Sequence, residues 1–335
     1  EGPPGTGKTL LAQCLATDSK SAFFGCSGTD FQAMFIGVGP MKVMRMYAKA
    51  RAAARQYGSC TTPETKILTS DFRWTRADEL KVGDEIIGLD EGSPGLHKKR
   101  RLRLGLVESA SPDQEKLVIV ITDKGKVTVT PNHPLLSHSL RGLRGTLYWT
   151  EAKDLMPGQL VKFIEPWTSE DGDSWLAGFL DGEGSVAWGR GLGRAFEIDL
   201  AQNEGSTLDR ARRELDKRNF NYSEYKMRTK YLTDKQCMNV RVNGMIQTLR
   251  LLGQVRPTRL LNRAIEIFRS GTPPALPHGT WASVLEVTEE QPGDIIRLQT
   301  SIRTYIADGF ISHNSVVFID EIDAIGGNRG NVSRN

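Results

Sequence analysis

The sequence predicts a multidomain chain in which a long insertion divides an α/β phosphate-binding domain in two. Three observations predict this. A glycine-rich loop opens the chain at Gly2–Thr9, and a short apolar strand near the other end, Val316–Glu321, finishes in two acids. Lys8 and Asp320 lie 312 positions apart. Because the elements of one compact α/β core are joined by short connections, this interval indicates an insertion.

The opening loop matches the phosphate-binding pattern G-x-x-x-x-G-K-[ST] in the run Gly2-Pro3-Pro4-Gly5-Thr6-Gly7-Lys8-Thr9. Its glycines let backbone N–H groups face a phosphate. Lys8 is expected to reach the β- and γ-phosphate oxygens of ATP, and the Thr9 hydroxyl to hold Mg²⁺. The apolar helix expected after it completes a strand–loop–helix unit.

The apolar strand near the far end is expected to supply the partner acids. Asp320 would bind the Mg²⁺ shell, and Glu321 would polarise the attacking water. The alternative is a buried strand with two solvent-facing acids at its end. Pairing with the glycine-rich loop favours the nucleotide site.

Here the two ends resemble one family, the AAA module of FtsH-type ATPases. The residues that carry the resemblance are Gly2–Leu15, Phe23-Phe24, Ser27–Phe31, Met34–Gly39 and Phe318–Gly326. The resemblance implies ATP and Mg²⁺ as cofactors and a homo-hexamer. It also places Phe35 on the central pore loop that grips a translocating polypeptide; a core aromatic is the alternative.

The FtsH-like pattern stops after Ser59 and resumes at Ser315. The 255 residues of Cys60–Asn314 lie between these points. Removing them would leave Lys8 and Asp320 only 57 positions apart and would join a helix end to a strand, as the ATPase requires.

The insertion resembles an intein, a protein-splicing element. The matching stretches are Cys60–Thr69, Leu80–Ile86, the T-x-x-H block Thr130-Pro131-Asn132-His133, and Tyr305–Asn314 followed by Ser315. The resemblance implies a β-rich, horseshoe-shaped splicing domain that brings Cys60 and Asn314 together. Taken one at a time, each of these residues is more often structural than catalytic, and their joint spacing favours function.

Each residue type suits a splicing step. The Cys60 thiol can attack the Ser59 carbonyl to form a thioester, and the Ser315 hydroxyl can then take over the acyl group. Cyclisation of Asn314 releases the insert, and an acyl shift joins Ser59 to Ser315; no cofactor is required. By resemblance, Thr130 holds the scissile bond, His133 protonates the departing Cys60 nitrogen and His313 is the final proton donor.

One position departs from the intein pattern. Many inteins carry an acid shortly before the last block, where this chain has Arg297, and Asp294 is out of register. We expect this to affect the efficiency of transesterification. The four cysteines, Cys14, Cys26, Cys60 and Cys237, form no C-x-x-C pair, so zinc, redox and disulfide frameworks are not supported and a reducing cytoplasm is expected.

A second resemblance lies inside the insertion. Trp175–Ser185 is similar to the LAGLIDADG signature of homing endonucleases. The resemblance implies that Ala177, Gly178 and Gly182 pack one helix on a symmetry mate and that Glu183 binds Mg²⁺ for phosphodiester hydrolysis. A plain buried helix with a glycine-rich stop is the alternative. Because one copy is found, the insert would be a homodimer, hide a degenerate second copy or be inactive.

The segment Arg190–Arg269 holds 17 Lys and Arg against 9 Asp and Glu, which suggests double-stranded DNA as a partner; a solvated charged face is the alternative. Strands are expected at Ala195–Ala201 and Met238–Val242, and helices at Thr207–Arg218 and Asn243–Leu252, as parts of one αββαββα unit. Candidates to face DNA are Arg194, Gln202, Lys226, Arg228, Lys230 and Arg241. Leu96–Arg103 is expected to be an exposed basic loop; a DNA contact there is the second reading.

We therefore expect a mainly-β horseshoe (Hint-type) splicing domain with an inserted α/β LAGLIDADG unit, flanked by fragments of an α/β P-loop AAA domain. The expected boundaries are 1–59, 60–165, 166–273, 274–314 and 315–335. The sequence shows no apolar run of the ~20 residues that span a membrane and no signal peptide, so a cytoplasmic location is expected. Since the chain opens with Glu1 inside a motif, we expect a fragment of a longer product. The alternative function is a defective insert in an FtsH-like ATPase whose only activity is ATP-driven unfolding.

Overall fold

The structure is a computed structural model that describes residues 23–24, 59–91, 100–138, 147–170, 172, 174–188, 196–227, 236–270, 274–276, 280–314 and 318–319. The chain divides into two compact units, Cys60–His313 and Glu1–Ser59 with Asn314–Asn335. In the second unit, β1 (Phe23–Phe24) pairs in parallel with β17 (Phe318–Ile319), Phe23 lying opposite Phe318. Because β1 lies near the start of the chain and β17 near its end, this parallel pairing places both ends of the chain in one sheet.

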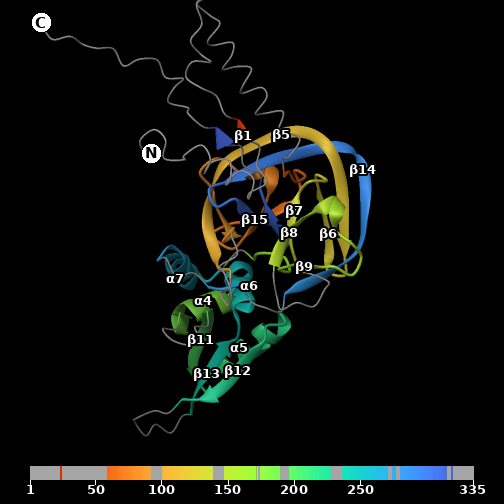
Figure 1. Ribbon diagram of the computed structural model, residues 1–335. Helices are drawn as coiled ribbons and strands as arrows, with labels where there is room; N and C mark the ends of the chain where they lie inside the picture. The colour runs from red at the N-terminus through yellow and green to blue at the C-terminus, as the bar shows by residue number, and fades with distance from the viewer. Residues whose placement is uncertain are drawn as a thin grey trace, which may run out of the picture. The chain divides into compact units, whose positions relative to one another are not determined.

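The unit Cys60–His313 contains an eleven-stranded sheet (Figure 1). Its strands run in the order β3-β2-β15-β16-β7-β9-β14-β5-β4, with β6 on β5 and β8 on β7. Their bounds are β2 (Lys66–Leu68), β3 (Trp74–Arg76), β4 (Glu85–Leu89), β5 (Leu102–Thr122), β6 (Gly125–Val129), β7 (Pro134–His138), β8 (Leu147–Glu151), β9 (Leu160–Lys162), β14 (Trp281–Thr300), β15 (Thr304–Ala307) and β16 (Phe310–His313). Two 3₁₀ turns, Ala77–Glu79 and Ala152–Asp154, connect them.

Two long strands, β5 and β14, pair antiparallel along their length and arc around the outside of this sheet (Figure 1). The pairing shifts register at three places, between Val284 and Glu286, between Glu290 and Gly293, and between Gln299 and Thr300. Such bulges bend a strand and increase its twist, which lets a ribbon of this length curve. This pairing places the residues of β5 that precede position 120 opposite the residues of β14 that precede position 300.

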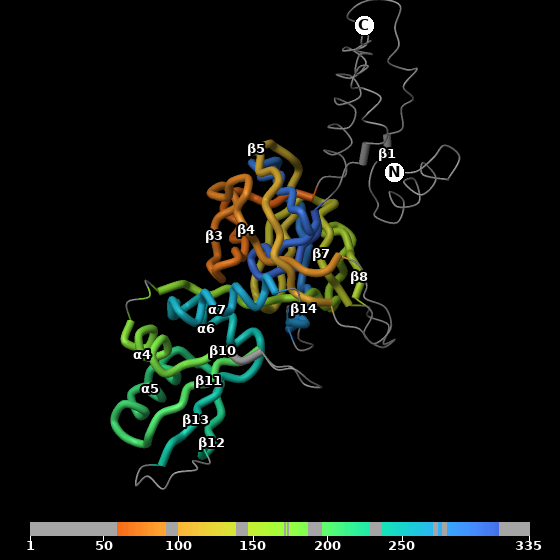
Figure 2. Tube along the Cα trace, turned by 90° about the vertical axis from the view of Figure 1, so that its left-hand side faces the viewer, coloured from red at the N-terminus to blue at the C-terminus, as the bar shows by residue number. Residues whose placement is uncertain are grey.

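An α/β unit lies between β9 and β14 in the chain. Its elements are α4 (Trp175–Glu183), β10 (Gly184–Trp188), β11 (Phe196–Asn203), α5 (Ser206–Lys217), β12 (Tyr222–Lys226), β13 (Cys237–Val242), α6 (Met245–Val255) and α7 (Thr258–Arg269). The strands form an antiparallel sheet in the order β10-β11-β13-β12, with α4 and α5 beside it (Figure 2). The strands and helices predicted for this segment are confirmed to within three residues at each end.

Local sequence patterns explain why helix α4 and strand β11 of this unit form where they do. Ser174 accepts a hydrogen bond from the Ala177 N–H at 3.2 Å and so caps the start of α4. Strand β11 alternates, with Phe196, Ile198 and Leu200 buried, because successive side chains point to opposite faces of a sheet. These three residues join the core that the helices cover.

The α/β unit shares one hydrophobic core with the large sheet. The rings of Phe72, after β2, and Phe268, on α7, lie 5.6 Å apart. Trp167 Nε1 donates to the Phe72 carbonyl at 2.9 Å. A Cβ added to Gly253 would lie 2.2 Å from that same carbonyl oxygen, so α6 approaches closely enough to require glycine. The α/β unit therefore packs on the segment after β2 of the large sheet through its helices α6 and α7.

Two expectations are wrong. The described part of Leu96–Arg103 is no exposed loop: Arg100 is 5% exposed and donates to the carbonyls of Asp90, at 2.8 Å, and Glu91, while β5 begins at Leu102. Positions 96–99 lie outside the described residues. Ala177 is buried in the unit's own core and not on a face open to a symmetry mate. In the described ranges, no helix has the length and apolarity to cross a membrane.

Candidate active site

Cys60 lies at the edge of two strands. Its neighbour Thr61 bridges Val129, at the end of β6, and Ile296 on β14. The Thr61 N–H donates to the Ile296 carbonyl at 3.3 Å, and the Ile296 N–H donates to the Thr61 carbonyl at 2.7 Å. Cys60 itself is 1% exposed and packs on Leu117 and Ile295. Strand pairing thus holds the thiol in a buried apolar position.

The turn after β6 holds both sides of the Cys60 main chain. The Cys60 N–H donates to Thr130 Oγ1 at 3.1 Å, and the Thr130 N–H donates to the Cys60 carbonyl at 3.2 Å. His133 Nδ1 lies 3.1 Å from the same carbonyl oxygen. The group that contacts the Cys60 nitrogen is therefore Thr130, while His133 faces the carbonyl on the other side of the residue.

Burial keeps both reactive side chains uncharged. It lowers the pKa of His133 to about 3, against the raising effect of its hydrogen bond to Cys60, and the charge of His313 lowers it further. Burial also raises the pKa of the Cys60 thiol to about 12. At neutral pH the site holds a neutral imidazole and a protonated thiol.

Three charged side chains face the thiol. Arg297 Nη1 lies 3.7 Å from Cys60 Sγ, Nε bonds Asp113 at 2.9 Å, and Nη2 bonds Glu115 at 2.6 Å. The cation lowers the pKa of Cys60, while the two carboxylates raise it. The sequence located Arg297 but missed both acids. Asp294 instead accepts from Gln114 at 2.9 Å.

The C-terminal end of the insertion lies beside the turn that contacts Cys60. Strand β16, which ends at His313, pairs with β7 through Ser312 and Leu135, and β7 begins directly after His133. The His133 ring lies edge-on to Tyr305 on β15, with centroids 6.0 Å apart. Thr304 pairs with His313. Residues more than 170 positions apart are thus brought together.

The residues that flank these two ends are also buried. Asn314, one peptide bond beyond His313, is 2% exposed, and Ser59, one bond before Cys60, is 4% exposed. Ser315 lies outside the described residues, as do the other predicted positions Gly2–Thr9, Phe35, Arg194, Arg228, Lys230, Asp320 and Glu321. The predicted nucleotide site thus lies outside the described part of the chain.

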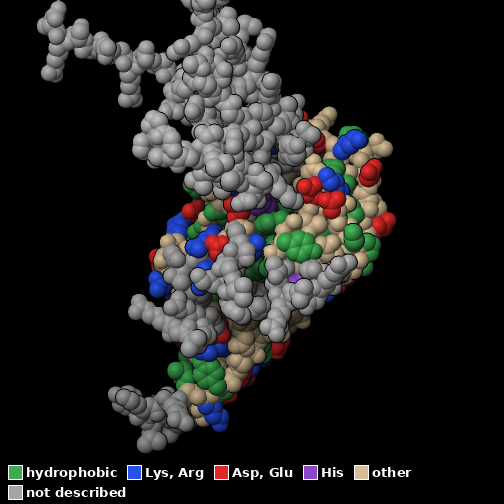
Figure 3. Space-filling model, in the orientation of Figure 1, with side chains coloured by type: hydrophobic (Ala, Val, Ile, Leu, Met, Phe, Trp, Pro, Cys, Tyr) green, Lys and Arg blue, Asp and Glu red, His purple; other side chains and the backbone are tan. Residues whose placement is uncertain are grey.

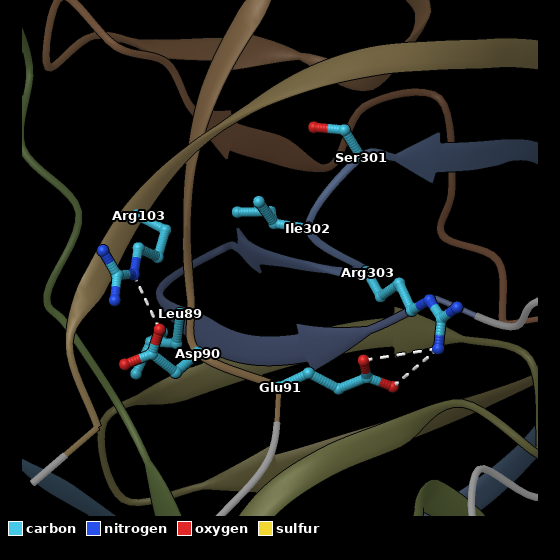
Figure 4. Close-up of a pocket in the computed structure, with 7 residues that line it drawn as sticks. All are labelled: Leu89, Asp90, Glu91, Arg103, Ser301, Ile302 and Arg303. Carbon is cyan, nitrogen blue, oxygen red and sulfur yellow. Dashed lines mark hydrogen bonds and ion pairs between the residues drawn. The ribbon is translucent and has the colours of Figure 1, made fainter. Parts of the chain in front are cut away.

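His313 has a polar neighbourhood. Its Nε2 lies 2.9 Å from Glu91 Oε1, and its ring packs on Trp149 with centroids 5.1 Å apart. Glu91 and Arg303 line a pocket of about 260 Å³ together with Leu89, Asp90, Arg103 and Ile302 (Figure 4). The sequence did not indicate Glu91, because a lone acid after a strand carries no signal.

The predicted endonuclease residues lie on the surface of the α/β unit. Glu183 is exposed at the end of α4, and a Cβ added to Gly178 or Gly182 would meet nothing within 4 Å. Asp181 accepts from the N–H groups of Arg259 and Leu260 at 2.9 and 3.3 Å and so caps the start of α7. Throughout the described ranges, no three His, Cys, Asp or Glu side chains gather as a metal site requires.

Much of the basic excess in this unit is paired. Arg241 on β13 bonds Asp199 at 2.7 Å and lies 3.4 Å from Glu197, both on β11. Arg212 pairs with three acids and Arg218 with two. Figure 3 shows acidic and basic side chains mixed on the visible described surface. These arginines are therefore held by acids of the same chain, and most of those acids are already among the 9 that the sequence count includes.

Comparison with known sequences gives one family. The model of the ATPase family associated with various cellular activities (AAA) matches residues 1–68. An ATP-dependent zinc metalloprotease FtsH 2 of Sorangium cellulosum is 35% identical over 122 residues, which is 36% of this chain and 17% of that protein. An FtsH of Oenococcus oeni is 52% identical over 54 residues, 16% of this chain and 8% of that protein. The N-terminal segment is thus AAA- and FtsH-like, and the chain spans less than a fifth of these relatives' length.

Comparison with solved structures finds inteins among the matching chains. The PabCDC21-1 intein has a TM-score of 0.35 and 12% identity, covering 76% of this chain and 98% of that one. The TvoVMA intein has a TM-score of 0.35 and 11% identity, covering 77% and 99%. Likeness at this level does not establish a shared fold.

Proposed function

We propose that Cys60–Asn314 is a self-splicing element that excises itself and joins Ser59 to Ser315. The observation that supports this most is the convergence of its two ends. Thr130 and His133 bond the main chain of Cys60, and the strand that ends at His313 pairs with the strand that follows His133. Transfer of the chain from Cys60 to Ser315 needs the two scissile bonds close together, because the Ser315 hydroxyl must reach the Ser59 carbonyl carbon.

The first step is an N-to-S acyl shift. The Cys60 sulfur bonds the Ser59 carbonyl carbon, the bond from that carbon to the Cys60 nitrogen breaks, and the thiol proton ends on the nitrogen. Thr130 Oγ1 lies 3.1 Å from this nitrogen, whereas His133 Nδ1 lies 3.1 Å from the Cys60 carbonyl oxygen, which belongs to the following peptide bond. Thr130 thus contacts the scissile amide itself, and the transfer of the proton is assigned to His133 on the other side of Cys60.

The later steps transfer the chain and release the insert. Ser315 Oγ displaces the thioester sulfur, which takes the hydroxyl proton. The Asn314 side-chain nitrogen then attacks its own carbonyl carbon, and the Ser315 nitrogen leaves with a proton. Finally the freed amine attacks the ester carbonyl, and Ser59 and Ser315 share an ordinary peptide bond. Each step is an acyl transfer that needs no cofactor.

Mass spectrometry of the freshly expressed chain tests this proposal. Splicing yields one product of Cys60–Asn314 and a second of residues 1–59 joined to 315–335. The Cys60→Ala/Asn314→Ala double variant keeps its full mass and serves as the control. A single unprocessed mass for the natural sequence as well would contradict the proposal.

For the joined product we propose an AAA module that binds ATP and Mg²⁺ through Gly2–Thr9 and Asp320 and assembles as a homo-hexamer. The AAA match to residues 1–68 and the FtsH relatives, named as ATP-dependent, support it. Because the insertion separates the two motifs, the unspliced chain should hydrolyse ATP poorly. Robust ATP turnover by the Cys60→Ala/Asn314→Ala variant would refute this.

For the α/β unit we propose a second activity, cleavage of double-stranded DNA by a homodimer. The order of its elements, with two strands after each of α4 and α5, and the exposed Glu183 beside the open positions Gly178 and Gly182 support it. A single carboxylate is too few for a Mg²⁺ site, so a second copy would supply the other. The test is a Mg²⁺-dependent plasmid-nicking assay, in which Glu183→Gln should abolish cleavage; nicking that survives the substitution would exclude this role.

A further inference from the structure

Glu91 lies two residues after the end of β4, and its carboxylate lies beside the His313 ring. Glu91 Oε1 lies 2.9 Å from His313 Nε2. Two donors fix its carbonyl: Trp149 Nε1, at 3.3 Å, and the Arg100 guanidinium. Figure 4 shows the side chain extending along the pocket wall toward Arg303. The contact with His313 is therefore built on a restrained main chain.

The His313 ring is restrained from a second side. Trp149 packs against it, and Arg100 in turn lies over the Trp149 ring at 5.3 Å from its centroid. Since Trp149 also donates to Glu91, one tryptophan positions both members of the pair. His313 is 8% exposed, so water competes weakly for its ring nitrogens.

One cation competes with His313 for the carboxylate. Arg303 Nη1 lies 3.4 and 3.5 Å from the two Glu91 oxygens, farther than the 2.9 Å of His313. The hydrogen bond to His313 lowers the pKa of Glu91 more than Arg303 does, and it outweighs the effect of burial. Glu91 is accordingly a carboxylate at neutral pH.

We propose that Glu91 is the positioning residue for release at Asn314: its carboxylate accepts the Nε2 proton of His313 in a hydrogen bond, sets the ring orientation and stabilises the imidazolium. This inference rests on the splicing function proposed above. A carboxylate on one ring nitrogen directs the other nitrogen toward the reacting group, as in other carboxylate–histidine pairs.

The step balances in atoms and protons. The Asn314 Nδ2 bonds the Asn314 carbonyl carbon and loses one proton to the imidazole. The bond from that carbon to the Ser315 nitrogen breaks, and the imidazolium returns one proton to that nitrogen. While His313 carries the proton, the negative charge of Glu91 stabilises it.

The other charges around the pair bear on its pH response. Arg303 and Arg100 both contact Glu91. Asp90 is paired with Arg103 at 2.6 Å. His133 is neutral above about pH 3, because burial lowers its pKa. Removing the Glu91 carboxylate would leave Arg303 and Arg100 near His313 with no negative charge from Glu91 to balance them. Removing Arg303 would instead take away the cation that competes with His313 for that carboxylate.

The test uses the full chain with Cys60→Ala, in which release at Asn314 proceeds without the first step. Relative to this parent, Glu91→Ala should slow release at least ~10-fold and move its pH midpoint to lower pH. Glu91→Gln keeps an acceptor but no charge and should slow it less, and Glu91→Asp should retain part of the rate. Arg303→Gln should act in the opposite direction. Glu79→Gln, an exposed acid elsewhere, is the matched control.

A second measurement, nitrogen NMR of the His313 ring, does not require the splicing reaction to take place. In the inert Cys60→Ala/Asn314→Ala chain, nitrogen NMR should show a slowly exchanging proton on His313 Nε2 that Glu91→Ala removes. An unchanged rate, pH profile and ring proton in Glu91→Ala would overturn the role of Glu91 alone. If the natural chain showed no excised Cys60–Asn314 by mass spectrometry, the splicing proposal would fall, and the positioning role with it.

Discussion

The two ends of the insertion lie at one site but in opposite electrostatic surroundings. At the first end, Cys60 is buried on Leu117 and Ile295, and desolvation raises its thiol pKa to about 12. At the second end, His313 faces the carboxylate of Glu91. The first end therefore opposes the charge its reaction needs, whereas the second end stabilises it. For the proposed splicing reaction, we therefore expect the first acyl shift to be slower than release at Asn314.

The largest expected effect separates the two histidines. His133→Leu should slow the acyl shift at Cys60 by ~10²–10⁴-fold, the usual loss for a proton-transfer group, and leave release at Asn314 nearly unchanged. His313→Leu should do the reverse. Hydroxylamine cleavage after Ser59 and mass detection of free Ser315 ends measure the two steps separately. If either variant blocked both steps equally, the ends would not be independent.

Next in size is the pH dependence of the first step. Because the thiol pKa is about 12, the thiolate fraction grows ~10-fold per pH unit throughout the neutral range. Hydroxylamine cleavage of the Asn314→Ala chain should therefore rise ~10²-fold between pH 7 and pH 9. A plateau near pH 8 would mean that the thiol ionises as an ordinary exposed cysteine does.

The charges around Cys60 give a smaller effect with opposite signs. Arg297→Gln removes the cation that lowers the thiol pKa and leaves Asp113 and Glu115, which raise it. This variant should slow the acyl shift ~10-fold. Asp113→Asn should speed it a few-fold. Rates of hydroxylamine cleavage at fixed pH compare them, and Glu79→Gln again serves as the control; a faster Arg297→Gln would reverse the assignment.

The smallest effect concerns the ring beside His313. Trp149→Leu keeps an apolar contact but removes the donor to the Glu91 carbonyl. It should slow release at Asn314 about five-fold, in line with the loss of roughly 1 kcal/mol for one hydrogen bond, and leave the acyl shift unchanged. Release rates in the Cys60→Ala chain measure it. Slowing at both ends would show that Trp149 supports the sheet in general.

The sequence predicted the parts of the site that are carried by local motifs. The turn Thr130–His133 follows a β-branched strand, and the helix Trp175–Glu183 has a capping serine and a glycine after it. Cys60 and His313 were identified because they lie at or next to the two positions where the FtsH-like pattern is interrupted. These features depend on a few adjacent residues, so they can be read without knowing what packs against them.

The groups that tune the site could not be read in this way. Arg297 and Asp113 are 184 positions apart, and His313 and Glu91 are 222 apart. Whether such pairs meet depends on the register of β14 on β5 and on the end of β4, and a shift of one residue would turn each side chain to the other face. Likewise, Arg100 was expected in a solvated loop, but the carbonyls that satisfy it come from a strand end ten residues before it.

The sequence by itself predicted which residues can react and where an insertion begins and ends in the chain, because nucleophiles, histidines and the interrupted pattern are properties of adjacent positions. Tertiary structure alone decided the protonation of those residues. The charge on Cys60, His133 and Glu91 depends on burial and on partners brought from distant strands, and both follow from how the long strands pair.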